Sequence, residues 1–188
     1  MRWKDHKERW IDCTDCSLCY TRNNVVLLRG TIPCDVLFIG EAPGVAEDVL
    51  GKPFVGPAGK LLDQIIKSSQ DLINVPYTTA FSNVVACIPF LPDSRVKVTE
   101  PPKEAIDACW QRLCEVVELC DPTLIVTLGK TAQETMALSD WEGFHFENLP
   151  HPAWLLRQDI TTKDMKIKQS YIKLADAVEE YLAPFKER

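Results

Sequence analysis

The stretch "VLFIGEAPGVAEDVLGKPFVGPAGKLLDQII", from Val36 to Ile66, joins a short apolar run to a helix-like segment through several glycines. A short apolar and β-branched run that ends in glycine is typical of a buried parallel strand. Pro57 stands near the first turn of the segment that follows, where proline is well tolerated in a helix. The stretch therefore predicts a strand, a glycine-rich turn with acidic side chains, and a helix.

The rest of the chain continues this alternation of apolar runs and amphipathic segments. Strands that alternate with helices predict an α/β fold, a three-layer αβα sandwich around a short, mostly parallel central sheet. Ligands of such sheets bind beyond the carboxyl ends of the strands, so we expect a crevice there. The expected strands are residues 35–40, 78–87 and 123–129, and the expected helices are residues 57–70, 102–120 and 171–182.

Length and charge limit the classes of protein. The chain has 188 residues, 46% of them hydrophobic, which suits a single domain over residues 1–188 with one core. Its formal net charge is -6, so a polyanion partner has to be held by local basic patches. No apolar run approaches the length of a membrane span, and the N-terminus "MRWKDHKERW" lacks the apolar core of a signal peptide. We expect a soluble, cytoplasmic monomer that does not bind a membrane.

Eight cysteines are many for a chain of this kind. In an intracellular protein cysteines are more often metal ligands, buried thiols or redox centres than disulfides. Cys13, Cys16 and Cys19 form a C-x-x-C-x-x-C run, Cys87 closes an apolar run, and Cys109 falls in a helix-like segment. We therefore expect an N-terminal cysteine-bearing segment that belongs to the domain.

Four motifs carry a family resemblance when they are taken in order. They are "GEAPG" at 40–44, "GKPFVGPAG" at 51–59, "SNVVAC" at 82–87 and "HPAWLLR" at 151–157. Together they resemble the uracil-DNA glycosylase superfamily, and the leading "CTDC" at 13–16 is most similar to its iron-sulfur-containing family-four branch. The resemblance implies a monofunctional DNA glycosylase that excises uracil by hydrolysing the N-glycosidic bond, a step of base excision repair, with uracil-containing DNA as its partner.

Two residues are the catalytic candidates. Glu41 would orient and activate the attacking water, or stabilise the cationic sugar. It could instead cap the turn that follows the strand. His151 would contact uracil O2 as negative charge builds on the departing base. A structural histidine is the alternative there.

Two further side chains are candidates for holding the base. Phe54 resembles the aromatic residue on which the family stacks the extruded base, although most phenylalanines are core residues. Asn83 can accept a hydrogen bond from uracil N3–H while it donates one to O4, a pattern that cytosine reverses. An asparagine that satisfies backbone groups at a strand end is the alternative for Asn83.

The first motif supplies the remaining candidates for base binding. Gly40 and Ala42 would let the backbone approach the base or the DNA, because bulky side chains would hold the ligand off. Glu47 matches the family position that crowds the C5 methyl group of thymine, but Asp48 stands directly beside it. Either acid could instead cap or solvate a turn.

The last motif supplies the candidates for DNA contact. Leu155 and Leu156 would form an apolar wedge that fills the gap left by the flipped nucleotide. Arg157 would meet phosphate groups. Core packing is the alternative for the leucines.

The resemblance also assigns the cysteines. Cys13, Cys16, Cys87 and Cys109 match the four ligands of a 4Fe-4S cluster. Four thiolates hold zinc equally well, and their spacing does not choose between the two. Such a cluster would tie the N-terminal segment to the domain.

One segment departs from the family pattern. Residues 88–108 form a longer connection than usual between two of the cysteines, and Ile88 stands where the family has a basic residue. The segment contains Arg95 and Lys97 but no histidine, which favours ordinary hydrolysis over the covalent trapping of a related branch. Two other functions stay open: a glycosylase for another deaminated or modified base, and a catalytically inactive iron-sulfur or zinc DNA-binding module.

Overall fold

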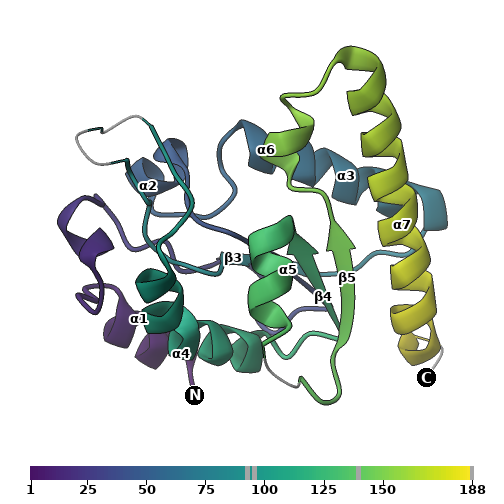
Figure 1. Cartoon of the computed structure of the whole chain (residues 1–188). Helices are drawn as coiled ribbons and strands as arrows, with labels where there is room; N and C mark the ends of the chain where they lie inside the picture. The colour runs from purple at the N-terminus through teal and green to yellow at the C-terminus, as the bar shows by residue number, and fades with distance from the viewer. Residues whose placement is uncertain (92–93, 95–96, 139–140, 187–188) are drawn as a thin grey trace.

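A mostly parallel sheet forms the centre of the molecule (Figure 1). The computed structural model describes residues 1–91, 94, 97–138 and 141–186. Within this part of the chain the strand order is β1-β3-β2-β4-β5, and only β1 runs antiparallel to its neighbour. The strands are β1 Arg29–Gly30, β2 Val36–Gly40, β3 Thr79–Asn83, β4 Leu124–Leu128 and β5 His145–Leu149.

Helices cover both faces of the sheet. Helix α4 packs on one face with α1 and α5, and α3 packs against α7 on the other. This arrangement confirms the predicted three-layer αβα sandwich. The helices are α1 Trp3–Trp10, the 3-10 turn η1 Ser17–Tyr20, α2 Val45–Leu50, α3 Pro57–Ile73, α4 Lys103–Cys120, α5 Lys130–Met136, α6 Pro152–Leu155 and α7 Ile160–Lys186.

Strand β2 shows why both layers are needed. All five of its residues are buried, because alternate side chains enter different cores. Leu37 and Ile39 join the cluster under α4, whereas Val36 and Phe38 join the cluster under α3 and α7. The apolar run is continuous because neither face of this strand meets water.

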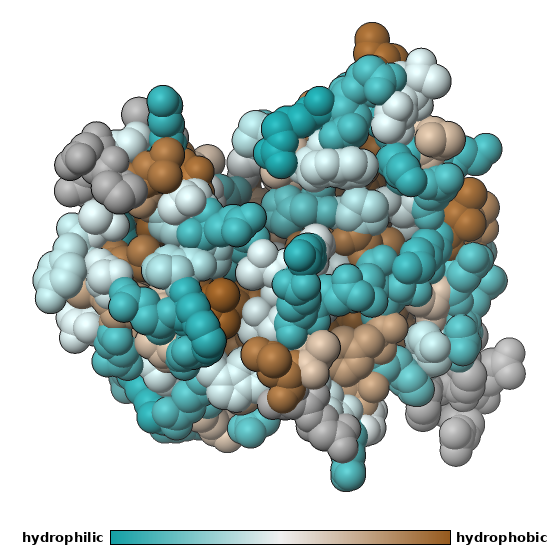
Figure 2. Space-filling view, viewed as in Figure 1, coloured by the Kyte–Doolittle hydropathy of each residue, from teal (hydrophilic) through white to brown (hydrophobic). Residues whose placement is uncertain are grey.

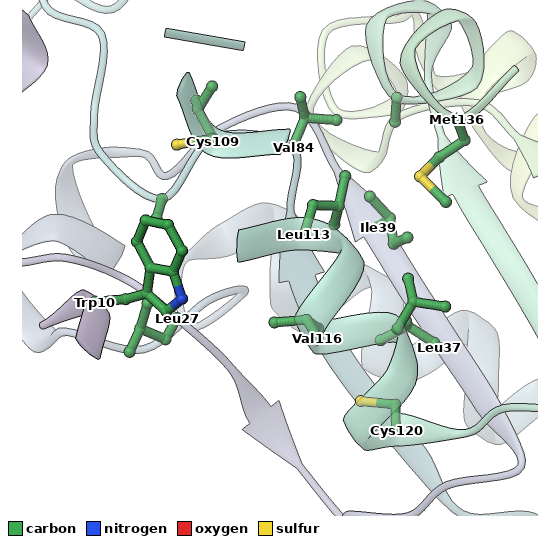
Figure 3. Close-up of a cluster of buried hydrophobic side chains, with 14 of the residues drawn as sticks. Trp10, Leu27, Leu37, Ile39, Val84, Cys109, Leu113, Val116, Cys120 and Met136 are labelled. Carbon is green, nitrogen blue, oxygen red and sulfur yellow. The ribbon is translucent and has the colours of Figure 1, made fainter. Parts of the chain in front are cut away.

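The cluster under α4 extends from the sheet to the N-terminal segment. Figure 3 shows Leu113 of α4 beside Ile39 of β2, with Cys109 and Trp10 at one end of the cluster. Both of these last two residues also line a small cavity that holds several cysteines. The N-terminal segment is therefore packed into the main core.

Three expected boundaries differ from the structure. Strand β3 ends at Asn83 instead of residue 87, and the segment beyond it pairs with the N-terminal segment through Val26 N–H and the Ala86 carbonyl at 2.7 Å. Helix α7 begins at Ile160, well before the expected start at residue 171. The sequence did not reveal its first turns, because their apolar side chains are exposed and show no clear helical periodicity. Strand β5 was not expected, since this edge strand buries little more than Leu149.

The long connection after Cys87 folds back on itself. Phe90 and Val98 form an antiparallel bridge, and the Thr99 N–H donates to the Pro89 carbonyl at 2.9 Å. Arg95 lies outside the described residues.

The helices also bear on membrane association. None of those in the described part of the chain is both long enough and apolar enough to span a bilayer.

Candidate active site

A cleft of about 1040 Å³ opens at the carboxyl ends of the central strands. In Figure 2 the surface is hollowed at the top of the view, between the part that carries α2 and the part that carries α6. Glu41 follows β2, Asn83 ends β3, Gly129 follows β4 and His151 follows β5, and all four residues line the cleft. The predicted crevice is therefore present, because parallel strands deliver their carboxyl ends to one edge.

A residue that follows the neighbouring strand β4 holds the Glu41 side chain in place. The hydroxyl of Thr131, at the start of α5, donates to Glu41 Oε2. Gly129, with φ of 85°, forms the left-handed turn that brings α5 back to this position. The carboxylate is therefore fixed across the cleft edge by a residue from another strand's loop, as a positioned acid-base group requires.

Asn83 presents an unsatisfied acceptor. The residue is 2% exposed, and its Oδ1 has no hydrogen-bond partner among the described residues. A buried carbonyl oxygen without a donor costs free energy, so such an atom indicates a missing ligand. Because the side chain also lines the cleft, that ligand would enter there.

Gly40 supports this site from behind. A Cβ on Gly40 would lie 2.5 Å from Asn83 Oδ1 and 2.6 Å from Phe54 Cζ, closer than real contacts allow. Gly40 is not among the residues that line the cleft, whereas Ala42 is. The approach of two side chains to the strand explains the glycine, and contact of its backbone with a base stays a prediction.

Phe54 is held in an unusual conformation. Its φ of 56° lies in the left-handed region, which costs about 1 kcal/mol or more for a residue with a Cβ. Gly59 lets α3 close on it, since a Cβ there would lie 1.9 Å from the Phe54 carbonyl oxygen. The ring lines the cleft, 6.5 Å from the ring of His151 between centroids, and its other side packs on Phe81. Strain maintained in this way is common at binding sites.

His151 has a neutral ring that accepts one hydrogen bond. Burial, and secondarily the charge of Arg157, lower the pKa of His151 to about 4. Its Nδ1 accepts a hydrogen bond of 3.1 Å from the Ala153 N–H at the start of α6. The single proton of the neutral ring is therefore on Nε2, because Nδ1 is already an acceptor.

Glu47 and Asp48 occupy different surroundings. Glu47 lines the cleft, but its Oε1 accepts hydrogen bonds from the backbone N–H groups of Val55 at 3.1 Å and Gly56 at 2.8 Å. Asp48 is buried and accepts from the backbone N–H of Asn23 at 2.9 Å, which ties down the N-terminal segment. Glu47 therefore fixes the loop that carries the aromatic ring at the edge of the cleft.

The two leucines of the last motif also differ. Leu155 is 0% exposed in the core under α7, so the expectation that it contacts DNA does not fit the structure. Leu156 is 42% exposed, and Arg157 is exposed and lines the cleft. On the short helix α6, successive side chains point in different directions, so only one of the pair can face outward.

The structure adds cleft residues that were not expected from the sequence. Thr131 is the second residue after the third predicted strand, in "LGKT", and its position there was the only available signal. Trp154, which lies inside a recognised motif, could have been found from that motif. Other additions come from the connection before α4 and from helices that are distant in sequence, and they include Val98, Thr99, Glu100, Lys130 and Lys166.

A second, smaller cavity contains the four cysteines that were predicted as ligands. Cys13, Cys16, Cys87 and Cys109 all line it. Burial first, and then the neighbouring thiols, raise the pKa of Cys87 to about 12, although the charge of Arg22 acts in the opposite direction. Among the described residues, no three Cys, His, Asp or Glu side chains are arranged to hold a metal ion. The thiols thus meet at one cavity without forming a preformed metal-ion site.

Two arginines at this cavity fit an anionic occupant. Arg22 Nη1 and Arg112 Nε are buried, and neither has a hydrogen-bond partner among the described residues. Buried N–H donors without acceptors are costly. Thiolates and sulfides of an iron-sulfur cluster would supply acceptors, so the donor set and its surroundings fit such a group.

The fold and this cleft place polar and aromatic side chains at the carboxyl ends of parallel strands, where α/β proteins bind their ligands. The chain belongs to the uracil DNA glycosylase superfamily, whose family model matches residues 29–175. The resemblance drawn from the four sequence motifs is thereby confirmed.

The curated relatives are more specific. A Type-4 uracil-DNA glycosylase of Thermotoga maritima is 34% identical over 187 residues, which cover 88% of this chain and 92% of that protein. A Type-4 uracil-DNA glycosylase of Sulfurisphaera tokodaii is 40% identical over 125 residues, 66% of this chain. The chain spans about half the length of that second relative, 53%.

A solved structure supports the fold independently. The crystal structure of SMUG2 from Pedobacter heparinus matches with a TM-score of 0.57 at 16% identity, and the match covers 77% of this chain and 76% of that one. At this identity the likeness concerns the arrangement of the sheet and helices.

Proposed function

We propose that this protein excises uracil from DNA by hydrolysing the N-glycosidic bond. The buried Oδ1 of Asn83 carries the proposal, because none of the described residues donates to it and a donor can enter through the cleft. Uracil N3–H is such a donor, whereas cytosine has an acceptor at N3. A site built around a hydrogen bond rejects a base that leaves its buried polar groups unpaired. The Type-4 uracil-DNA glycosylases among the relatives support the same substrate.

Glu41 supplies the acid-base chemistry in this proposal. The bond between sugar C1′ and base N1 breaks, and its electron pair leaves with the base. Water adds to C1′ while Glu41 accepts its proton, and the negative carboxylate stabilises the cationic sugar. The hydrogen bond from Thr131 orients the carboxylate, so that water can approach the other oxygen.

His151 stabilises the leaving group. Negative charge grows on the uracil oxygens as the bond breaks, and the Nε2–H of a neutral ring donates to O2. Because the pKa of His151 is about 4, the ring is neutral at physiological pH and gives no proton away. The departing base therefore leaves as a hydrogen-bonded anion.

The remaining contacts hold the flipped nucleotide and the DNA. Phe54 stacks on the base, an interaction worth about 1 to 3 kcal/mol. Glu47 fixes the loop on which that ring stands and faces the side of the base that bears the C5 methyl group in thymine. Leu156 fills the gap in the duplex, and Arg157 contacts a phosphate.

Cys13, Cys16, Cys87 and Cys109 hold a 4Fe-4S cluster in this proposal. The unpartnered N–H groups of Arg22 and Arg112 support an anionic cluster. When bound, the cluster cross-links the N-terminal segment to α4 and to the segment after β3, and takes no part in electron transfer. Zinc is the alternative occupant, and metal analysis of the purified protein decides between them.

A single domain over residues 1–188, a monomer and a cytoplasmic location stay predictions.

Base release from matched oligonucleotides tests the proposal. We would incubate purified protein with strands that carry uracil, hypoxanthine, xanthine or cytosine, and identify the released base by mass spectrometry. Release of uracil alone is the expected result. Asn83→Asp should lose the preference for uracil, because a carboxylate repels O4.

The same experiment covers the two other functions. Preferential release of hypoxanthine or xanthine would replace uracil with another deaminated base, with Val98 and Thr99 forming part of the pocket wall. Tight DNA binding without release of any base would indicate a DNA-binding module and refute the proposal.

A further inference from the structure

Arg112 is a buried cation between the two sites. It is 1% exposed and is the largest of the fully buried side chains in the described part of the chain. It forms no ion pair among the described residues, and Glu115, one turn along α4, is already bonded to Arg9 at 2.7 Å. A buried guanidinium needs hydrogen bonds and a negative partner to offset the cost of its desolvation.

One end of Arg112 holds the end of β3. Its Nη1 donates to the Ser82 hydroxyl oxygen at 3.0 Å. Its Nη2 donates to the Val84 carbonyl at 2.8 Å and also to the Asn83 carbonyl. Three consecutive residues are therefore clamped by one planar group, and the middle residue carries the unpartnered acceptor of the cleft.

The other end of Arg112 meets the four-cysteine cavity. The Cys109 thiol, on the same face of α4, lies beside the guanidinium, and both residues line that cavity. Figure 3 shows Cys109 on α4 and Val84 of the clamped segment in the same buried cluster. Cys87 stands four residues beyond Asn83 on the clamped segment. The same two elements, α4 and the segment after β3, thus build both sites.

We propose that Arg112 is a positioning residue that couples the four-cysteine cavity to base recognition by holding the backbone of Asn83. The inference rests on the proposed role of Asn83 in binding uracil and adds a residue on which that role depends. An anionic group in the cavity would attract the guanidinium on the side that faces Cys109. The other side of the guanidinium donates hydrogen bonds to the Ser82 hydroxyl and to the carbonyl oxygens of Asn83 and Val84. Disturbing either end should loosen the Asn83 side chain at the other.

The first experiment measures discrimination between bases without catalysis. We would compare binding of oligonucleotides that carry 2′-fluoro-deoxyuridine or 2′-fluoro-deoxycytidine, whose glycosidic bonds resist cleavage, to the metal-loaded protein. Arg112→Lys keeps the charge but lacks the planar fork, so the preference for uracil should fall about tenfold. Arg9→Lys is the matched control, because it makes the same change in an arginine that contacts α4 away from the cleft, and it should keep the wild-type preference.

A double-mutant cycle separates positioning from general stability. If Arg112 acts through Asn83, Arg112→Lys should have no further effect on the preference in an Asn83→Ala background. Additive losses in the cycle, or an Arg112→Lys protein with the wild-type preference, would overturn the inference while leaving uracil excision intact. A wild-type protein without any preference for uracil would overturn the proposed function as well.

Hydrogen exchange supplies a readout that does not depend on DNA. The Val84 and Val85 N–H groups donate to the Gly40 and Glu41 carbonyls at 2.8 Å and 3.1 Å. Their exchange should accelerate in Arg112→Lys and in iron-depleted wild-type protein, and slow exchange in both would contradict the coupling. If Arg112→Lys does not fold, Ser82→Ala carries the test, since it removes one acceptor of the clamp and should shift binding and exchange in the same directions.

Discussion

The cleft and the four-cysteine cavity differ in the kind of polar atom that each leaves unsatisfied. Within the described part of the chain, the buried atom without a partner in the cleft is an acceptor, Asn83 Oδ1, whereas those at the cavity are donors, Arg22 Nη1 and Arg112 Nε. The cleft is open and large, and the cavity is small and enclosed by core residues. An open site with a free acceptor suits a neutral ligand that enters and leaves. A closed site with free donors suits an anionic group that stays.

The comparison also explains the charges around each site. The histidine of the cleft is neutral, so a base can bind there without meeting a fixed positive charge from that ring. At the cavity, two arginines stand next to thiols, and a metal-thiolate group would neutralise them. Each region thus has the electrostatic character that its proposed occupant requires.

The largest effect is expected when the chemistry of the cleft alone is removed. Glu41→Gln should lower the single-turnover rate of uracil release about 10²- to 10⁴-fold, because it loses the base that activates water. Binding of uracil-containing DNA and the iron content should both stay at wild-type levels. Rapid-quench kinetics and metal analysis measure the two quantities. A full single-turnover rate would show that another group activates the water.

The second-largest effect is expected from a substitution in the four-cysteine cavity that leaves the cleft unchanged. Cys87→Ser should reduce iron from about four atoms per chain and lower the thermal stability, because the cluster loses one of its ligands. Cys34→Ser is the control, since Cys34 is buried outside the cavity. Metal analysis and thermal unfolding are the measurements. Equal iron in the two variants would remove Cys87 from the ligand set.

The third prediction compares the buried Leu155 with the exposed Leu156. Leu155→Ala should lower the free energy of unfolding by about 2 to 5 kcal/mol, since it leaves a cavity in the core. Leu156→Ala should leave stability nearly unchanged and slow uracil release from duplex DNA more than from single strands, because only the duplex has to be opened. Denaturant unfolding and paired rate measurements check both. Equal slowing on both substrates by Leu156→Ala would refute the wedge.

A smaller effect on the rate of uracil release is expected from Thr131, which orients the Glu41 carboxylate. Thr131→Val removes the hydroxyl that donates to Glu41 and should slow uracil release about tenfold without changing DNA affinity. Thr131→Ser keeps the hydroxyl and should restore most of the rate. Single-turnover kinetics distinguish the two variants. If the serine variant were as slow as the valine variant, shape and not the hydrogen bond would explain the loss.

The smallest effect concerns pH, and it tests the neutrality of the histidine. The unfolded His151 binds a proton below its ordinary pKa of 6.5, but the folded residue does so only near 4. The free energy of unfolding should therefore fall as the pH drops from 6.5 toward 4, and His151 should contribute no such change above 6.5. The ratio of the wild-type rate to the His151→Asn rate should stay constant between about pH 8 and pH 5. A change in that ratio near pH 6.5 would indicate a histidine that titrates normally.

Much of the site was predictable from the sequence because it depends on local patterns. The apolar run that ends in Gly40 placed Glu41 at a strand end, whereas the expected strand 78–87 extended past Asn83, which ends the strand in the structure. His151 was identified from its motif alone, because the strand before it was not expected. The four cysteines meet at one cavity as the resemblance implied, although their pairing with two arginines was not visible in the spacing.

What the tertiary structure alone decided concerns partners that are distant in sequence. Nothing in the pattern of "HPAWLLR" separates a buried Leu155 from an exposed Leu156, because that choice depends on where α7 packs. The hydrogen bond from Thr131 to Glu41 likewise requires β4 to lie beside β2. From the sequence alone, Arg112 would be predicted to lie on the exposed, charged face of an amphipathic helix. Only the packing of α4 on the sheet buries it and places its guanidinium between the cysteines and Asn83. Periodicity thus specified which elements form, and the contacts between them determined which polar atoms lack a partner.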